Sequence, residues 1–77
     1  MPDTVNIELD LSGLTCPLPL LKTKQSLNKM GVGEVVKVIA TDPGSERDFQ
    51  VFTQQSGNRL LKFTKEDGRF LYWIEKR

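Results

Sequence analysis

The stretch Gly13–Lys22, GLTCPLPLLK, marks the place where a predicted strand gives way to a predicted helix. Pro17 is expected at the first helical position, where its missing amide hydrogen costs nothing and its fixed φ suits the helix. Pro19 still falls in the first turn, whose amides have no partner within the helix. We therefore expect a proline-braced helix that begins directly after Cys16, the only cysteine in the chain.

The residues on either side of this junction predict the first half of the fold. Apolar and polar side chains alternate over 5–11, which indicates a strand with one buried face. Apolar residues near helical spacing then predict a helix over 17 to about 30. The β-branched, apolar stretch over 34–41 is typical of a more central strand.

The second half predicts one helix and a hairpin. A variant capping box formed by Ser45 and Asp48 opens a helix that runs to about residue 56. Two strands over 59–66 and 69–76 then flank Asp67-Gly68, a strong hairpin signal. The open sheet face would carry Val35, Ile39, Leu60, Leu71 and Trp73. The face toward the helices would carry Val36, Val38, Leu61, Phe63, Phe70, Tyr72 and Ile74.

The element order is therefore β-α-β-α-β-β. Each β-α-β crossover should be right-handed, which places both helices on the same side of the sheet. The expected fold class is α+β: a two-layer α/β sandwich in which a four-stranded mixed sheet carries two helices on one face. At 77 residues, a single domain spanning 1–77 is expected.

Composition narrows the classes of function. A formal net charge of +1 favours no nucleic-acid partner. No apolar run approaches the length of a membrane span and no secretory signal is visible, so we expect a cytoplasmic protein without a membrane partner. The chain has no histidine and one cysteine, which excludes a Cys-His nucleophile pair and a structural zinc site within one chain. We expect neither a metal nor a cofactor.

Cys16 is the candidate reactive residue. Its sulfur is expected to face the positive end of the helix dipole and free amides such as that of Leu18, with Lys22 and Lys24 nearby. Such sites lower a thiol pKa to roughly 3.5 to 7.5, against about 8.5 for a free thiol. The thiolate could accept a sulfur atom as a persulfide and pass it on. The alternative is that Cys16 is a small buried hydrophobe, and the residues alone leave both interpretations open.

The CPxP motif at Cys16-Pro17-x-Pro19, preceded by Leu9-Asp10 and Gly13-Leu14, resembles the signature of the TusA/SirA-like sulfur carriers. The resemblance covers nearly the whole chain; further matching positions are Met30, Gly33-Glu34, Asp42-Pro43, Asp48, Gly57 and the closing hairpin. It implies a fold similar to the C-terminal domain of a bacterial translation initiation factor. It also implies that Cys16 carries the persulfide.

The resemblance further implies two protein partners. The sulfur donor would be a cysteine desulfurase or a rhodanese-like protein, and a downstream acceptor protein would receive the sulfur. The destination would be tRNA 2-thiouridine or dissimilatory sulfur trafficking. Thr41 departs from many carriers of the tRNA pathway, which have an acid there. That difference leaves the pathway and the partners open.

Four charged residues are candidates for docking a partner. Lys22 and Lys24 could form a basic face that steers an acidic partner. Asp42 and Arg47 follow the second strand, so they should lie at the same edge as Cys16 if the first two strands are parallel. Ordinary surface charge or turn chemistry is the alternative at each position. We expect a monomer, although the apolar open face of the sheet could bind a second copy.

A non-catalytic regulatory or RNA-binding module is the alternative function, because the last hairpin carries lysines and aromatic residues. The near-zero net charge argues against it, as does the lack of basic and aromatic residues interleaved on one face. A self-sufficient sulfurtransferase acting on thiosulfate is a third interpretation. It would need Arg47 and the lysines to hold the anion. We expect a carrier that acts with partner enzymes rather than a stand-alone enzyme.

Overall fold

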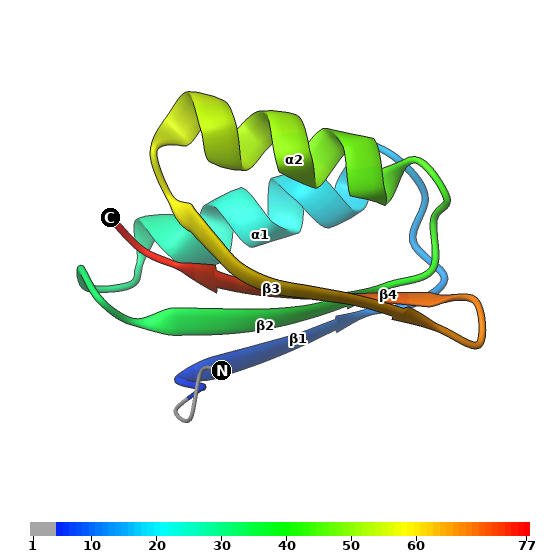
Figure 1. The fold of residues 1–77 in the computed structure, drawn as a ribbon, viewed down its shortest axis with the longest axis horizontal. Helices are drawn as coiled ribbons and strands as arrows, with labels where there is room; N and C mark the ends of the chain where they lie inside the picture. Colours follow the sequence, from blue (N-terminus) through cyan, green and yellow to red (C-terminus); the bar gives the residue numbers. More distant parts are fainter. Residues whose placement is uncertain (1–4) are drawn as a thin grey trace.

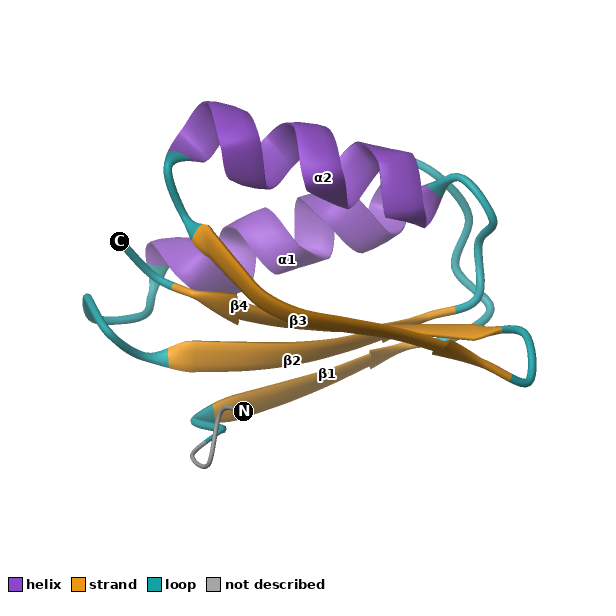
Figure 2. Cartoon of the chain, viewed as in Figure 1, coloured by secondary structure: helices purple, strands orange, loops and turns teal. Residues whose placement is uncertain are grey.

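The computed structural model describes residues 5–77, and its elements follow the predicted β-α-β-α-β-β order (Figure 1). Both helices cover one face of a four-stranded sheet, which confirms the predicted α+β two-layer fold (Figure 2). The elements are β1 (Ile7–Leu11), α1 (Leu18–Asn28), β2 (Val35–Ala40), α2 (Ser45–Ser56), β3 (Arg59–Glu66) and β4 (Arg69–Glu75).

The sheet has the strand order β1-β2-β4-β3. β1 and β2 pair in parallel, whereas the β2–β4 and β3–β4 pairs are antiparallel. β1 begins at Ile7, two residues later than predicted. Asn6, directly before it, pairs with Val35 through both its backbone and its side chain: its N donates to Val35 O, and its Oδ1 accepts from Val35 N, each at 2.9 Å. The parallel β1–β2 pair brings the loops that follow these two strands to one edge of the molecule.

The core fills the space between the sheet and the two helices. Tyr72 of β4 lies at its centre, with the Phe49 ring centroid of α2 at 4.4 Å and the Phe63 ring centroid of β3 at 5.2 Å. Aromatic contacts of this kind add to the free energy gained from burying the rings. The buried apolar residues of the core are Leu11, Leu27, Met30, Val36, Val38, Ala40, Phe49, Phe70, Tyr72 and Ile74.

The predicted facing of two leucines in β3 is wrong. Leu60, expected on the open face, pairs with Ile74 and packs against the core. The next register pair is Lys62 with Trp73, so Leu61 is an extra residue at a bulge. A bulge shifts the alternation of side chains by one position. Phe63 therefore faces the helices as predicted. Leu61 does not join Leu60 and Phe63 among the β3 side chains that pack against the core.

The open face of the sheet is partly covered by its own lysines. The ammonium groups of Lys37 and Lys62 lie 5.4 and 5.1 Å from the ring centroid of Trp73. Lys37 also pairs with Glu8, at 3.4 Å between Nζ and Oε2. Lysine stems can cover apolar surface in this way while their charged ends stay in water. The face is thus more polar than the row of predicted apolar residues implies.

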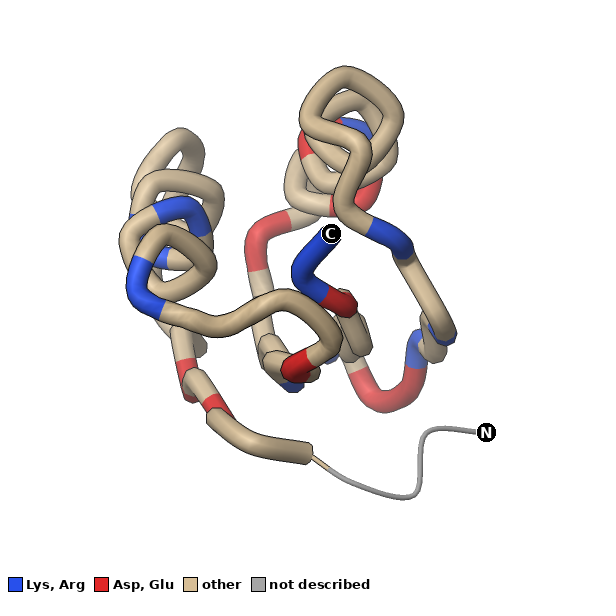
Figure 3. Tube along the Cα trace, turned by 90° about the vertical axis from the view of Figure 1, so that its left-hand side faces the viewer, with Lys and Arg blue, Asp and Glu red and all other residues tan. Residues whose placement is uncertain are grey.

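The two helices differ in charge. α1 carries the basic residues Lys22 and Lys24 and no acidic residue, whereas α2 carries Glu46 and Asp48 in its first turn (Figure 3). Acidic side chains near a helix N-terminus are stabilised by the helix dipole. The first turn of α2 lies at the same edge of the molecule as the start of α1 (Figure 1).

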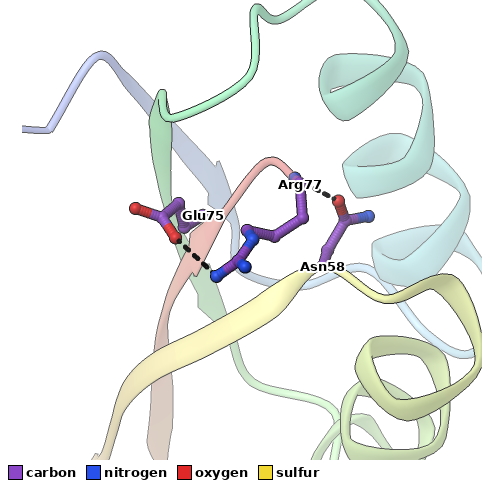
Figure 4. Close-up of polar contacts among 3 residues, drawn as sticks. All are labelled: Asn58, Glu75 and Arg77. Carbon is purple, nitrogen blue, oxygen red and sulfur yellow. Dashed lines mark hydrogen bonds and ion pairs between the residues drawn. The ribbon is translucent and has the colours of Figure 1, made fainter.

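The end of the chain is tied to the start of β3. Arg77 N donates a hydrogen bond to Asn58 Oδ1 at 3.0 Å, and its guanidinium lies 3.6 Å from Glu75 Oε1 (Figure 4). Lys76 Nζ donates to the carbonyl oxygen of Leu27 at 2.9 Å, near the end of α1. These contacts hold β4 against α1 at the edge opposite the cysteine loop.

Neither described helix has the length and apolar character needed to cross a bilayer.

Candidate functional site

Cys16 lies exposed in the loop between β1 and α1, as a free thiol. Its Sγ donates a hydrogen bond to Asp48 Oδ2 of α2 at 3.0 Å. The loop is also tied to the end of β2, because Gly13 N donates to Thr41 Oγ1 at 2.9 Å. The parallel pairing of β1 and β2 thus places the thiol against the start of α2. The interpretation of Cys16 as a buried hydrophobe is wrong.

The start of α1 differs from the prediction in two respects. Pro17 is the N-cap, so the first helical residue is Leu18 and buried Pro19 is the second. The amide of Leu18 already donates to Thr15 O at 2.9 Å. It is therefore not available to the Cys16 sulfur, contrary to the prediction. The proline brace remains, because neither proline has an amide hydrogen that would need a partner.

The predicted lowering of the Cys16 pKa is wrong for the chain without a bound partner. The hydrogen bond to Asp48 raises the pKa of Cys16, and desolvation and the negative charges of Asp48 and Asp42 raise it further. A hydrogen bond donated by the neutral thiol favours that form, and nearby carboxylates oppose a second negative charge. No bond from the Leu18 amide opposes these effects, because that amide already donates to Thr15 O. The resting thiol is therefore held protonated.

The predicted capping box at the start of α2 is also wrong. Gly44 is the N-cap, and no side chain in the described part of the chain caps this helix. Ser45 is buried instead, and its Oγ shares a hydrogen bond of 2.8 Å with the hydroxyl of Tyr72. Asp48 turns toward Cys16 rather than back to the helix start. The side chains expected to cap the helix therefore anchor it to the core and contact the thiol.

Asp42 lies where the sequence placed it, close enough for its charge to act on the Cys16 thiol. Its Oδ2 is buried and has no hydrogen-bond partner among residues 5–77. Arg47 is exposed in the first turn of α2, and Lys22 is exposed on α1. The site therefore gathers Cys16, Asp42 and Asp48, with Arg47 directly before Asp48 in the chain. A docking role for Asp42, Arg47 and Lys22 stays a prediction.

Lys24 belongs to a different part of the surface. Its Nζ lies 5.5 Å from the ring centroid of Phe52, and it lines a groove of about 290 Å³ near the ends of α1 and α2. The groove is lined by Lys24, Leu27, Asn28, Phe52, Ser56, Asn58, Lys76 and Arg77. Because α1 rises about 1.5 Å per residue, this groove lies at the far end of the helix from Cys16. It is not part of the thiol site.

The described residues contain no group of three Asp, Glu, Cys or His side chains arranged to hold a metal ion. The chemistry of the site rests on one exposed sulfur and two carboxylates. An exposed sulfur can form and break bonds to another sulfur atom, with a partner protein approaching from solvent. Local sequence reasoning misses the contact from Asp48, because the residue pattern assigns Asp48 to a helix cap. Only the family resemblance singles it out.

Known proteins match this chain over nearly its whole length. A family model described as sulfurtransferase TusA matches residues 7–76. The chain is 54% identical over 69 residues to the sulfur carrier protein TusA of Allochromatium vinosum, covering 90% of this chain and 91% of that one. It is 43% identical over 74 residues to the TusA of Pseudomonas syringae, covering 96% and 88%.

A crystal structure shares the fold. It is that of a SirA-like protein from Desulfitobacterium hafniense, with a TM-score of 0.80 and 27% sequence identity. The match covers 90% of this chain and 95% of the other. The two sequence relatives and the structural relative therefore each match at least 90% of this chain.

Proposed function

The chain belongs to the TusA sulfurtransferase family, and from this membership we propose that it is a sulfur carrier that holds a persulfide on Cys16. The observation that carries this proposal is the exposed, free thiol at the proline-braced start of α1. A partner protein can reach this sulfur from solvent. Since Cys16 is the only cysteine, no second thiol in the chain competes for the sulfur or resolves the persulfide into a disulfide.

Loading follows from ordinary thiol-disulfide chemistry. The Cys16 sulfur attacks the outer sulfur of a persulfide on the donor. A new S–S bond forms to Cys16, the donor's S–S bond breaks, and its electron pair stays on the donor's cysteine. The proton that leaves Cys16 is balanced by the one that this cysteine takes up. No oxidant is needed, because one sulfur atom moves between two thiols.

The donor in this proposal is a cysteine desulfurase or a rhodanese-like protein. A downstream acceptor protein would take the sulfur by the same reaction in reverse. The destination would be tRNA 2-thiouridine or dissimilatory sulfur trafficking. Asp42, Arg47 and Lys22 are the residues we expect at the edge of the docking surface, since Asp42 lies beside the thiol and the other two are exposed on the adjoining helices.

Intact mass spectrometry tests the proposal. The purified chain is incubated with a cysteine desulfurase and cysteine, or with polysulfide, beside the Cys16→Ser variant. A gain of one sulfur atom that reductant removes, and that the variant lacks, is the expected result. If no donor produces the adduct, the carrier function is refuted. Binding of RNA that survives in Cys16→Ser would then favour a binding module.

A further inference from the structure

We propose that Asp48 is a positioning residue, which holds the Cys16 thiol as a hydrogen-bond donor while the carrier is empty and releases it when a cationic side chain of the sulfur donor pairs with the carboxylate. This inference rests on the proposed function as a sulfur carrier. It assigns Asp48 a role in the loading step itself. It also specifies the chemistry of the group that the donor must present beside its persulfide.

The first support is that Asp48 is held in place by the core. The adjacent Phe49 is fully buried against Tyr72, and one turn earlier Ser45 is bonded to the same tyrosine. The Asp48 amide donates to Gly44 O at 3.2 Å, within the first turn of the helix. The backbone of Asp48 is thus held in place by the core, at a position from which its carboxylate reaches the thiol.

The second support is that no other side chain of the described structure engages the carboxylate, although it also lies favourably at the positive end of the α2 dipole. α2 is capped by Gly44 without help from any side chain. Among residues 5–77, Asp48 forms no ion pair, and the hydrogen bond to its side chain is the one from Cys16 at 3.0 Å. The bond from the thiol is therefore the one specific side-chain interaction that the described structure gives this carboxylate.

The third support is that this hydrogen bond cannot persist after loading. In the empty carrier, Cys16 Sγ has a hydrogen to donate. In the persulfide, Sγ is bonded to Cβ and to the transferred sulfur, so it has no hydrogen. Asp48 then loses its donor, and any negative charge on the outer sulfur lies beside a carboxylate, which is unfavourable. The contact therefore distinguishes the empty state from the loaded one.

The charges that act on Cys16 indicate what must displace the contact. They are Asp48 from α2 and Asp42 from the loop between β2 and α2, and both are acidic. Asp42 also keeps a buried oxygen without a partner among the described residues. A lysine or arginine from the donor would complement both carboxylates and remove what opposes thiolate formation. The side of the site next to Cys16 thus fits a basic group.

Alkylation of the empty carrier tests the first half of the proposal. The rate at which iodoacetamide modifies Cys16 is followed by intact mass across a pH series, for the unmodified chain and for Asp48→Asn. We expect the midpoint of the variant to lie at lower pH. For each whole pH step by which the midpoint falls, the rate of modification at pH values below both midpoints should rise about tenfold. Asp48→Glu, which keeps the charge, should restore much of the original profile.

The matched control is Glu46→Gln. It removes one acid from the same turn of α2 but from a side chain that does not contact Cys16. Thermal unfolding first establishes that each variant is folded. Coincident profiles for Asp48→Asn and the unmodified chain would overturn the proposal. Equal shifts in Asp48→Asn and Glu46→Gln would also overturn it, because they would show an effect of net charge alone.

Loading rates test the second half. Asp48→Asn should be loaded faster by polysulfide, because its thiol ionises more readily, but more slowly by the donor protein, because the ion pair is lost. If both rates rise together, the donor does not engage Asp48 and this half is wrong. If no donor protein loads the unmodified chain, the proposed function fails, and the second half fails with it. The alkylation profile still decides the first half in that case.

Discussion

The hydroxyl of Ser45 and the phenol oxygen of Tyr72 lie 2.8 Å apart in the core, and this contact joins the first turn of α2 to the central strand β4. Both residues are buried, so neither oxygen has water as an alternative partner. Together with the buried Phe49 ring, the contact anchors the first turn of α2 to the sheet. Asp48 lies three residues further along the helix, so contacts inside the core help to place its carboxylate beside Cys16.

Burial raises the pKa of Tyr72 to about 12. The unfolded chain ionises this group near its ordinary value of about 10. The folded state therefore keeps a proton that the unfolded state loses, so the free energy of unfolding should fall as pH rises from about 10 to about 12. Because Tyr72 is the only tyrosine, its ultraviolet absorbance titration checks this directly. A midpoint near 10 in the folded protein would contradict the prediction.

Asp42→Asn should lower the pKa of Cys16, but less than Asp48→Asn does. Asp42 acts on the thiol through its charge alone, whereas Asp48 adds a hydrogen bond, which is the larger effect. The measurement is the pH midpoint of Cys16 alkylation in the two variants, with the same reagent and salt. An Asp42→Asn shift equal to or larger than that of Asp48→Asn would show that the hydrogen bond is not the dominant contact.

Phe49→Ala should lower the free energy of unfolding by about 3 to 5 kcal/mol. The side chain is fully buried and its ring contacts Tyr72, so the change removes apolar contacts and leaves a cavity. In a domain of this size, that loss is a large part of the total stability. Urea unfolding gives the value. Val51→Ala, on the exposed side of the same helix, should change it by less than about 1 kcal/mol.

The bulge in β3 predicts unequal roles for two neighbouring leucines. Leu60→Ala should destabilise the fold by about 1 to 3 kcal/mol, because Leu60 packs against the core. Leu61→Ala should cost less, because the register shift leaves Leu61 out of the inward row. Urea unfolding of the two single variants compares them under one condition. If Leu61→Ala is the more destabilising change, the alternation continues without a bulge.

The order of elements and the sheet could be predicted because they depend on local patterns. The alternation before Leu11, the β-branched stretch around Val38 and the Asp67-Gly68 turn each indicate one element within a few residues. A helix between two neighbouring strands is typical of a parallel β-α-β unit, which accounts for the β1–β2 pair, and the right-handed crossover then places the helix on one face of the sheet. This reasoning also brings Asp42 to the edge where Cys16 lies.

The environment of the thiol could not be predicted in the same way. The Cys16–Asp48 contact spans 32 positions and depends on the angle at which α2 lies over the sheet. The first turn of α2 is anchored to the sheet by the Ser45–Tyr72 bond, which no local pattern indicates. Local rules assign Ser45 and Asp48 to a helix cap, and they assign a free amide to Leu18. Ser45 and Asp48 instead meet partners from distant parts of the chain, and the amide of Leu18 bonds to Thr15 O. Local rules therefore predict a Cys16 pKa that shifts in the wrong direction.

The position of Trp73 between Lys37 and Lys62 has a practical consequence for experiments on this protein. Trp73 is the only tryptophan, and it projects from the side of the sheet away from the helices and from Cys16. Its fluorescence should therefore report whether the chain is folded and stay the same when the sulfur atom is added or removed. Fluorescence and mass spectrometry together would give two independent signals from an unlabelled sample. Fluorescence would report whether the chain is folded, and mass spectrometry would report whether Cys16 carries the added sulfur atom.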